Sequence, residues 1–352
     1  MGLPEILINF KTQGTTAIDR SARGIVALIL KDDTKDFDTK LYKSVQEVDS
    51  EDWTEENKDY IEKTFMGTPR EVIVERIAKA DTDYSKALAR LKNKKWNYLA
   101  VPGIEEGNTE NIVSWIKTER DTNKKTYKAV LPNAAGDHEG IINFTTESIK
   151  VKDKIYSAGQ YTGRIAGILA GLPFTRSATY YQLSEVEAVT ASTDPDADID
   201  GGKLILVNDG TKIKIGRGVN SLTSLDGAKG EEFKKIKIVD AVDLMRDDIR
   251  NTFDGSYVGK ITNSYDHKVL FLSAVNAYFE ELERLEVLDS AYDNKAQIDI
   301  QTQRTYLLSR GVDVDSLKPQ EIKEYNTGSK VFATAKVKFL DAMEDLQMEI
   351  YM

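Results

Sequence analysis

Residues able to do acid–base or metal chemistry are sparse in this 352-residue chain, which has only two histidines. His138 lies in the glycine-flanked loop GDHEG, and His267 opens an expected long helix. Neither belongs to an H-E-x-x-H zinc motif. A hydrolytic triad would have to combine one of them with scattered serines and aspartates. We expect a surface or capping role for both, and an α/β hydrolase with an unrecognised site is the alternative.

Two other segments could bind an ion. Asp196, Asp198 and Asp200, followed by a glycine, match the opening of a calcium-binding loop. The twelfth position of that loop needs a bidentate glutamate and here is Val207, so an acidic turn is favoured. The stretch at 219–223 could form a phosphate-binding turn but lacks the required glycine spacing. With no Walker A loop and no G-x-S-x-G elbow, we expect no cofactor, no metal and no enzymatic activity.

Composition narrows the class of protein. Acidic residues outnumber basic ones by 58 to 48, and the resulting net charge of −10 argues against a nucleic-acid partner. Without any cysteine, disulfides and thiolate metal sites are excluded, which suits a reducing cytoplasm. No apolar run approaches the roughly 18–20 residues of a membrane span, and no signal peptide is recognisable. We expect a soluble protein of two or three domains without membrane insertion.

The elements that position these residues follow from hydrophobic patterning. In the first part of the chain, short apolar runs alternate with amphipathic segments. We predict strands at 24–30, 71–77, 96–101 and 126–131. We predict helices at 52–65, 83–92 and 109–120. This alternation is typical of α/β units around a largely parallel sheet.

Beyond Gly140 the pattern changes to short strands and longer helices. We predict one or two strands within 141–151 and further strands at 178–190, 203–207, 212–215, 236–239, 296–300 and 331–339, of which 178–190, 203–207 and 212–215 should be antiparallel. We predict helices at 158–172, 240–251, 266–288 and 301–310. On the first of these helices, four glycines recur at every fourth residue: Gly159, Gly163, Gly167 and Gly171. This bare stripe should let the helix approach another backbone closely.

Both ends of the chain alternate apolar and other residues in the manner of a half-buried strand. The two strands comprise Ile6, Leu7, Ile8, Asn9 and Phe10, and Met348, Glu349, Ile350, Tyr351 and Met352. Neither has a hairpin partner nearby in the sequence, although chain ends are normally frayed and polar. Each must pair with a distant edge of its own molecule or with another molecule, and strand donation to a neighbour is an established mode of assembly. The ends therefore predict a polymer subunit rather than a free enzyme.

Seven short motifs, taken in order, resemble those of contractile phage tail sheath proteins, in particular the sheaths of Gram-positive defective prophages and R-type bacteriocins. They are SARGIV at 21–26, GRIAGILAG at 163–171, RGVNSLT at 217–223, KIKIV at 235–239, YVGK at 257–260, NTGSKV at 326–331 and DAMED at 341–345. They span nearly the whole chain. The family's middle domain is subtilisin-like in shape, but this sequence has no protease triad.

The resemblance implies an α/β fold with a subtilisin-like-shaped core and a C-terminal α+β domain completed by strands exchanged between subunits. The implied segments are an N-terminal arm at 1–20, a sheath core at 21–225 that is β-rich from about 140, a C-terminal sheath domain at 226–340 and a C-terminal arm at 341–352. The strand receiving an arm is expected to carry Val331, Ala333, Val337 and Phe339. Four basic residues are expected to face the inner tube, with a solvated charged surface as the alternative: Arg304, Arg310, Lys318 and Lys323.

The resemblance also implies a function. Rings of six subunits would stack helically around an inner tail tube, with baseplate and tail terminator proteins as further partners. Contraction of this metastable lattice would drive the tube through a target cell envelope without nucleotide hydrolysis. Assembly would take place in the bacterial host cytoplasm, before release in a phage tail or bacteriocin particle. A type VI secretion sheath component is disfavoured, because those sheaths use two chains and this chain carries both arms.

Overall fold

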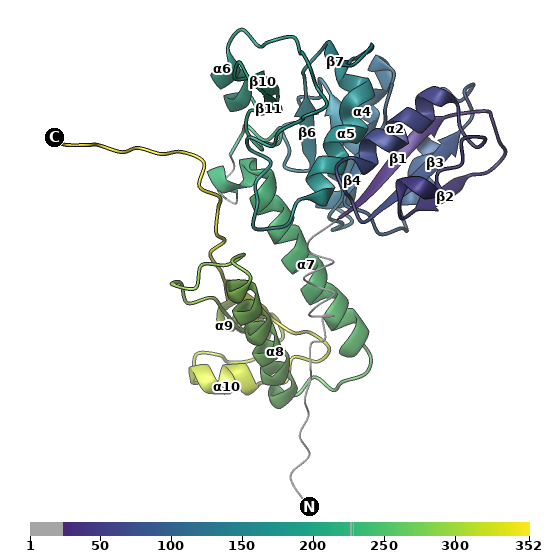
Figure 1. The fold of residues 1–352 in the computed structure, drawn as a ribbon. Helices are drawn as coiled ribbons and strands as arrows, with labels where there is room; N and C mark the ends of the chain where they lie inside the picture. The colour runs from purple at the N-terminus through teal and green to yellow at the C-terminus, as the bar shows by residue number, and fades with distance from the viewer. Residues whose placement is uncertain (1–23, 226, 228) are drawn as a thin grey trace, which may run out of the picture. The chain divides into compact units, whose positions relative to one another are not determined.

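The computed structural model describes residues 24–352 except 226 and 228, so the predicted N-terminal strand lies outside the described residues. The chain forms two units (Figure 1). The described residues from Gly24 to Asp240, together with Ala342–Met352, make the first, here called the α/β unit. Ala241–Asp341 make the second, here called the C-terminal unit. Within the described residues, the chain therefore passes between the units twice.

A seven-stranded sheet forms the α/β unit, in the order β2-β3-β1-β4-β5-β6-β9. Its strands are β1 (Ile25–Lys31), β2 (Thr39–Tyr42), β3 (Glu71–Ile77), β4 (Tyr98–Ala100), β5 (Lys128–Pro132), β6 (Ile141–Phe144) and β9 (Lys203–Leu204). All neighbouring pairs are parallel except β2 with β3. The predicted parallel-rich α/β sheet is thus confirmed.

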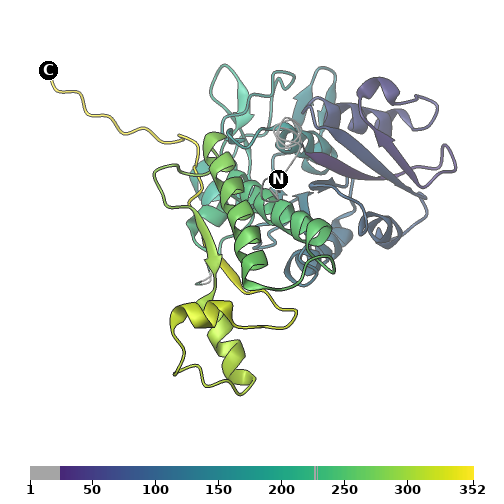
Figure 2. The same ribbon diagram turned by 90° about the horizontal axis from the view of Figure 1, so that it is seen from below.

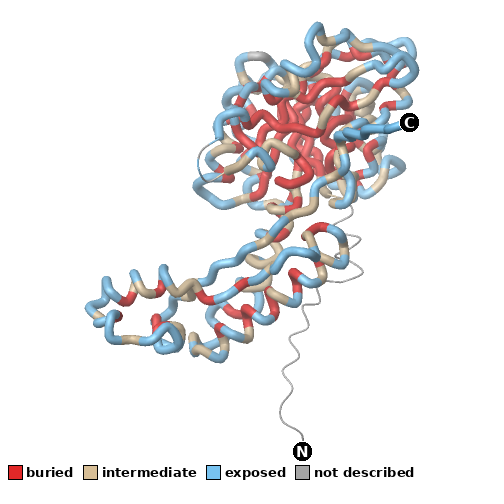
Figure 3. Tube along the Cα trace, turned by 90° about the vertical axis from the view of Figure 1, so that its left-hand side faces the viewer, coloured by how far each residue is buried: buried red, intermediate tan, exposed pale blue. Residues whose placement is uncertain are grey.

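Helices cover both faces of this sheet. They are α2 (Glu55–Phe65), α3 (Ser85–Leu91), α4 (Thr109–Asp121) and α5 (Ala158–Gly171). Because alternate residues of a strand point to opposite faces, Val26 and Leu28 of β1 pack with α2 and α5, whereas Ala27 packs with α3 and α4. All five inner residues of β1 are buried, as expected for a strand covered on both faces (Figure 3).

The glycine stripe of α5 lies against α2, as the spacing predicts. A Cβ atom added to Gly167 would lie 2.0 Å from the carbonyl oxygen of Thr64. One added to Gly171 would lie 1.8 Å from the carbonyl oxygen of Gly67. Only glycine permits so close an approach of two helix backbones. At the start of the helix, a Cβ atom added to Gly159 would have Cγ of Pro132 as its nearest neighbour, at the ordinary contact distance of 3.6 Å.

The rest of the α/β unit is built from small elements. These are the hairpins β7 (Ile149–Val151) with β8 (Lys154–Tyr156) and β10 (Leu206–Asn208) with β11 (Ile213–Ile215), the helix α6 (Pro195–Asp200), and the 3-10 turns η1 (Val45–Glu47), η2 (Glu106–Asn108) and η3 (Glu231–Lys234). The predicted strand at 178–190 is wrong, since only isolated bridges at Gln182 and Ala188 form there. A positive φ of 58° at Tyr180 turns the chain and prevents a continuous ladder.

The acidic segment before β9 is a helix rather than a calcium loop. Asp194 caps α6 by accepting a hydrogen bond from the backbone N–H of Ala197. The carboxylate of Asp198 pairs with Lys203 at 2.7 Å and accepts a hydrogen bond from Ser192. Asp196 and Asp198 lie in the first turn, where acidic groups interact favourably with the helix dipole.

Helices and a two-stranded ribbon make up the C-terminal unit. Its elements are α7 (Ile236–Ser256), which begins in the α/β unit, α8 (Tyr265–Arg284), β12 (Lys295–Ile298), α9 (Ile300–Ser309), α10 (Pro319–Glu324) and β13 (Ala333–Lys336). The predicted strand at 236–239 is wrong, because these residues form the first turn of α7. Four consecutive buried residues suit a buried strand and a buried helical turn equally. None of the described helices combines the length and apolar character that a bilayer crossing requires.

A buried carboxylate ties the sheet to α2. Asp32 follows β1 and is fully buried. It accepts hydrogen bonds from the backbone N–H groups of Thr34 (2.8 Å) and Thr54 (2.9 Å) and from the side-chain amide of Asn57 (2.7 Å). Burial alone would raise the pKa of Asp32, but these hydrogen bonds outweigh it and lower the pKa to about 2.

The substitution Gly167→Ala should destabilise the α/β unit by about 1–3 kcal/mol or more, because its methyl group meets the backbone of Thr64. Gly159→Ala is the matched control on the same helix and should be neutral or slightly stabilising. Urea unfolding followed by circular dichroism compares the two. Equal stability of both variants would contradict the close helix approach.

The substitution Asp32→Asn should lower the free energy of unfolding at pH 7 by about 2 kcal/mol, since each pKa unit corresponds to about 1.4 kcal/mol. The pKa of Asp32 is lower in the folded chain, so its contribution is complete above about pH 4 and is lost as the pH falls through about 2. The difference from wild type should therefore shrink in urea titrations run between pH 4 and pH 2. Asp153→Asn, at an exposed site, is the control for replacing a carboxylate by an amide.

Candidate functional site

His138 holds a loop in place and does not carry a catalytic contact. Its Nδ1 accepts a hydrogen bond from the N–H of Gly140 (3.0 Å), and its Nε2 faces Asp121 (3.3 Å) and Glu139 (3.5 Å). Burial lowers the pKa of His138, so the ring is neutral and its Nε2 donates to these carboxylates. The hydroxyl of Ser221 contacts the backbone N–H and carbonyl of His138 rather than the ring. This is not the geometry of a nucleophile and its base.

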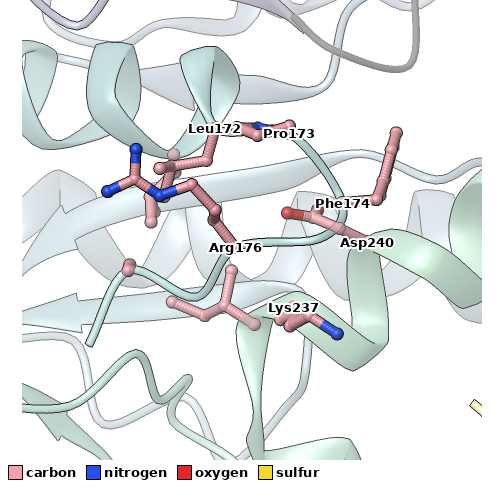
Figure 4. Close-up of a pocket in the computed structure, with 9 residues that line it drawn as sticks. Leu172, Pro173, Phe174, Arg176, Lys237 and Asp240 are labelled. Atoms are coloured by element: carbon pink, nitrogen blue, oxygen red, sulfur yellow. The ribbon is translucent and has the colours of Figure 1, made fainter. Parts of the chain in front are cut away.

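His267 lies in the exposed first turn of α8, where the side chain of Ser264 caps the helix. Its Nδ1 is 2.7 Å from the carbonyl oxygen of Thr262, to which it donates. Neither histidine reaches the pocket in Figure 4, which contains no hydroxyl side chain either; the lining residues are Leu169, Leu172, Pro173, Phe174, Arg176, Ala178, Ile236, Lys237 and Asp240. Within the described residues, no group of three or more His, Cys, Asp or Glu side chains is arranged to hold a metal ion.

The C-terminal segment, residues 346–352, exposes an unusual amount of apolar surface. The exposed fractions are 85% for Leu346, 66% for Met348, 75% for Ile350 and 120% for Met352. All residues of the predicted C-terminal strand are exposed, and the segment is extended but pairs with no strand of the described chain (Figure 1). Apolar residues that alternate along an extended segment are suited to pairing with a sheet edge.

The two-stranded ribbon of the C-terminal unit offers such an edge (Figure 2). β12 pairs antiparallel with β13, from Lys295 opposite Lys336 to Ile298 opposite Ala333. The β12 side of the ribbon packs against α8, where Asn276 exchanges two hydrogen bonds with the backbone of Ala296. All four residues of β13 are exposed, and within the described chain its outer edge pairs with no other strand.

The predicted receiving residues fall only partly on β13. Ala333 lies on the strand, Val331 precedes it, and Val337 and Phe339 follow it. Phe339 forms an isolated bridge with Leu288 in the same unit. The strand is shorter than predicted because the chain leaves the ladder after Lys336.

The four basic residues proposed to face a tube are spread over a small helical lobe. Arg304, on α9, pairs with Asp315, whereas Arg310 and Lys318 are exposed and Lys323, on α10, is half-buried. From the start of α9 to the end of α10, the chain has four basic and four acidic residues. These residues are therefore not part of a strongly basic surface.

Sequence reasoning missed several elements, among them α10 in the C-terminal unit and β2 in the α/β unit. α10 has proline at its first position, a signal of a helix start that was available in the sequence. β2 is a short edge strand with one buried residue, and its mixed composition gives no strand signal.

Comparison with known proteins identifies the family. Residues 78–221 match the phage tail sheath protein central domain, and residues 228–352 match the phage tail sheath C-terminal domain. The tail sheath protein of Clostridium phage phiCD119 is 40% identical over 366 aligned residues, which cover 100% of this chain and 99% of that protein. The phage-like element PBSX protein XkdK of Bacillus subtilis is 28% identical over 180 residues, covering 49% of this chain and 38% of that protein.

Solved structures have the same fold. A sheath tail protein of Listeria innocua superposes with a TM-score of 0.70 at 16% identity, covering 96% of this chain and 100% of that chain. A chain from the helical sheath of the anti-feeding prophage in its contracted state superposes with a TM-score of 0.68 at 12% identity, covering 100% of this chain and 99% of that chain. On the full-length match at 40% identity, this chain belongs to the phage tail sheath proteins, a family of structural proteins of the phage tail.

Proposed function

We propose that this chain polymerises into a contractile sheath around an inner tail tube, and that strands contributed by its two ends join neighbouring copies. The observation that carries this proposal is the exposed apolar alternation of residues 346–352 in a chain of the sheath family. Support comes from the anti-feeding prophage, since a chain of its helical sheath and a chain of its baseplate have the same fold.

The acceptor in this proposal is the outer edge of β13 in a second copy. A free strand edge presents backbone N–H and carbonyl groups that another strand can pair with. Leu346, Met348 and Ile350 would then lie on one face of the added strand, with Glu349 and Tyr351 on the other. The N-terminal residues Ile6, Leu7, Ile8, Asn9 and Phe10 have the same alternation and would serve as a second arm.

One arm alone binds weakly. A six-residue strand gains on the order of 5 kcal/mol from about five backbone hydrogen bonds and about 6 kcal/mol from burying three apolar side chains. Ordering those residues costs about 9 kcal/mol, which leaves a couple of kcal/mol in favour of pairing. Two arms per subunit, engaged around a ring, raise the effective concentration enough to make a lattice. Free copies with a net charge of −10 therefore stay apart until a tube or baseplate templates them.

In this proposal the energy for contraction is stored in the extended lattice and does not come from nucleotide hydrolysis. Subunits arranged in rings of six would swing outward as near-rigid bodies while the exchanged strands stay paired, because hinges absorb the rotation. The inner tube protein, the baseplate and the tail terminator would be the other partners. The particle would be assembled in the bacterial host cytoplasm and released as a tail.

The arm assignment predicts a difference between the two faces of the terminal strand. Ile350→Asp, Ile8→Asp or deletion of residues 347–352 should leave a folded monomer that forms no sheaths, because a charge or a gap replaces a buried apolar contact. Gln347→Asp, on the opposite face, should still assemble. Negative-stain microscopy after co-expression with the tube protein compares them. Full-length tubes from the deletion variant would refute the arm.

The tube-facing residues predict a salt dependence. Arg310→Glu and Lys318→Glu, and in a second pair Arg304→Glu and Lys323→Glu, should weaken attachment of the sheath to the tube at low salt, where charge interactions are least screened. Lys43→Glu, an exposed change in the α/β unit, is the control. Co-sedimentation of sheath and tube across a salt series measures the effect. Unchanged attachment at every salt concentration would reject these residues.

A further inference from the structure

Glu344, two residues before the exposed C-terminal segment, is held inside the α/β unit. Its side chain is only 5% exposed, whereas Met343 before it and Leu346 after it are exposed to 104% and 85%. The carboxylate Oε1 accepts hydrogen bonds from the hydroxyls of Ser177 (2.7 Å) and Thr179 (2.6 Å). The chain therefore turns one acidic side chain inward at the point where it leaves the unit.

Two cations complete the surroundings of this carboxylate. Lys235 Nζ lies 3.4 Å from Oε2, and Arg217 Nε lies 3.9 Å from it. Arg217 also pairs with the neighbouring carboxylate of Asp345. A carboxylate at such low exposure is favourable only when it is paired and hydrogen-bonded; here Oε1 accepts the hydrogen bonds and Oε2 faces the two cations. Removing its charge would leave two cations facing one another without their common partner.

Backbone N–H groups hydrogen-bond to the two hydroxyl oxygens that face Glu344. The backbone N–H of Thr179 donates to the Ser177 hydroxyl at 3.1 Å, and the N–H of Gly218 donates to the Thr179 hydroxyl at 3.0 Å. The hydroxyl hydrogen of Thr179 is then directed to the carboxylate, and the hydroxyl of Ser177 lies within hydrogen-bond distance of both the carboxylate and the Thr179 oxygen (3.0 Å). The seat for Glu344, defined as Ser177, Thr179, Arg217 and Lys235, is built from three separate segments of the chain.

We infer that Glu344 is an anchor, which fixes the start, or root, of the C-terminal segment to the α/β unit of its own subunit. A second copy that binds residues 346–352 is then connected directly to that unit. This inference rests on the proposed strand exchange. It makes residues 346–352 the free length of the arm, which reaches about 23 Å when extended. A force that pulls on the arm would then be transmitted to the subunit at the seat rather than through residues 241–341.

The anchor can be tested in the monomer, independently of assembly. The chain has no cysteine, so Met343→Cys and Lys212→Cys, both at exposed positions of the α/β unit, carry the only two spin labels. Double electron–electron resonance should give one narrow distance distribution. Adding Glu344→Ala should abolish the narrow peak and broaden the distribution, while circular dichroism stays unchanged. Glu349→Ala removes an exposed acidic residue and is the matched control, expected to leave the peak intact.

The conservative variant separates charge from hydrogen bonding. Glu344→Gln keeps an oxygen for the two hydroxyls but loses the attraction to Arg217 and Lys235, so its distribution should lie between those of wild type and Glu344→Ala. A narrow peak that persists in Glu344→Ala overturns the anchor.

Assembly then tests the coupling. Glu344→Ala should raise the protein concentration needed for sheath formation by about tenfold relative to the wild-type chain, because the freed root must be ordered again on docking. A released root with unchanged assembly would overturn the coupling. Normal assembly after deletion of residues 347–352 would instead refute the proposed strand exchange, and the spin labels would still decide whether the anchor exists.

Discussion

Backbone N–H and carbonyl groups of an extended segment must be satisfied by water or by another strand, and this constraint governs the chain's C-terminal segment. Residues 346–352 are extended, apolar at alternate positions and without a strand partner in the described part of the molecule. β13 presents the complementary feature, an exposed strand with one paired edge. In the proposed function these two features are the donor and the acceptor of an exchanged strand, and one polypeptide that carries both could assemble with copies of itself.

The strand pairings proposed for the chain ends are individually weak, so they can hold a lattice together only if each subunit is rigid. The α/β unit meets that need through a sheet covered on both faces and through backbone-to-backbone packing of α2 against α5. Close-packed interiors transmit displacement with little internal rearrangement. Buried polar groups such as Asp32 and His138 serve the same end, because each joins loops at the rim of the sheet to the helices beside it.

Local pattern was enough to predict the parts of the fold in which each segment has one plausible structure. The strand at 71–77 is β3 with the predicted limits, and the glycine stripe correctly indicated a close helix contact. Prediction failed where tertiary contacts decide. The first turn of α7 has a burial pattern that a strand could share, and the segment at 178–190 is shaped by contacts with β7 and β11. The seat of Glu344 combines positions 177, 179, 217 and 235, and no local spacing reveals it.

In the described part of the chain, each of the two passages between the units has a carboxylate that is held within the α/β unit. Asp240, the last residue before the first passage, accepts hydrogen bonds from the hydroxyl of Tyr98 at 2.6 and 2.7 Å and pairs with Lys128 at 3.0 Å. Glu344 does the same just after the second passage, with Lys235 as its cation. Charge-assisted hydrogen bonds at low exposure are short and directional, so they fix position better than apolar contacts do. If the sheath contracts as proposed, such contacts would hold the two passages in place and confine the motion to the segments between them.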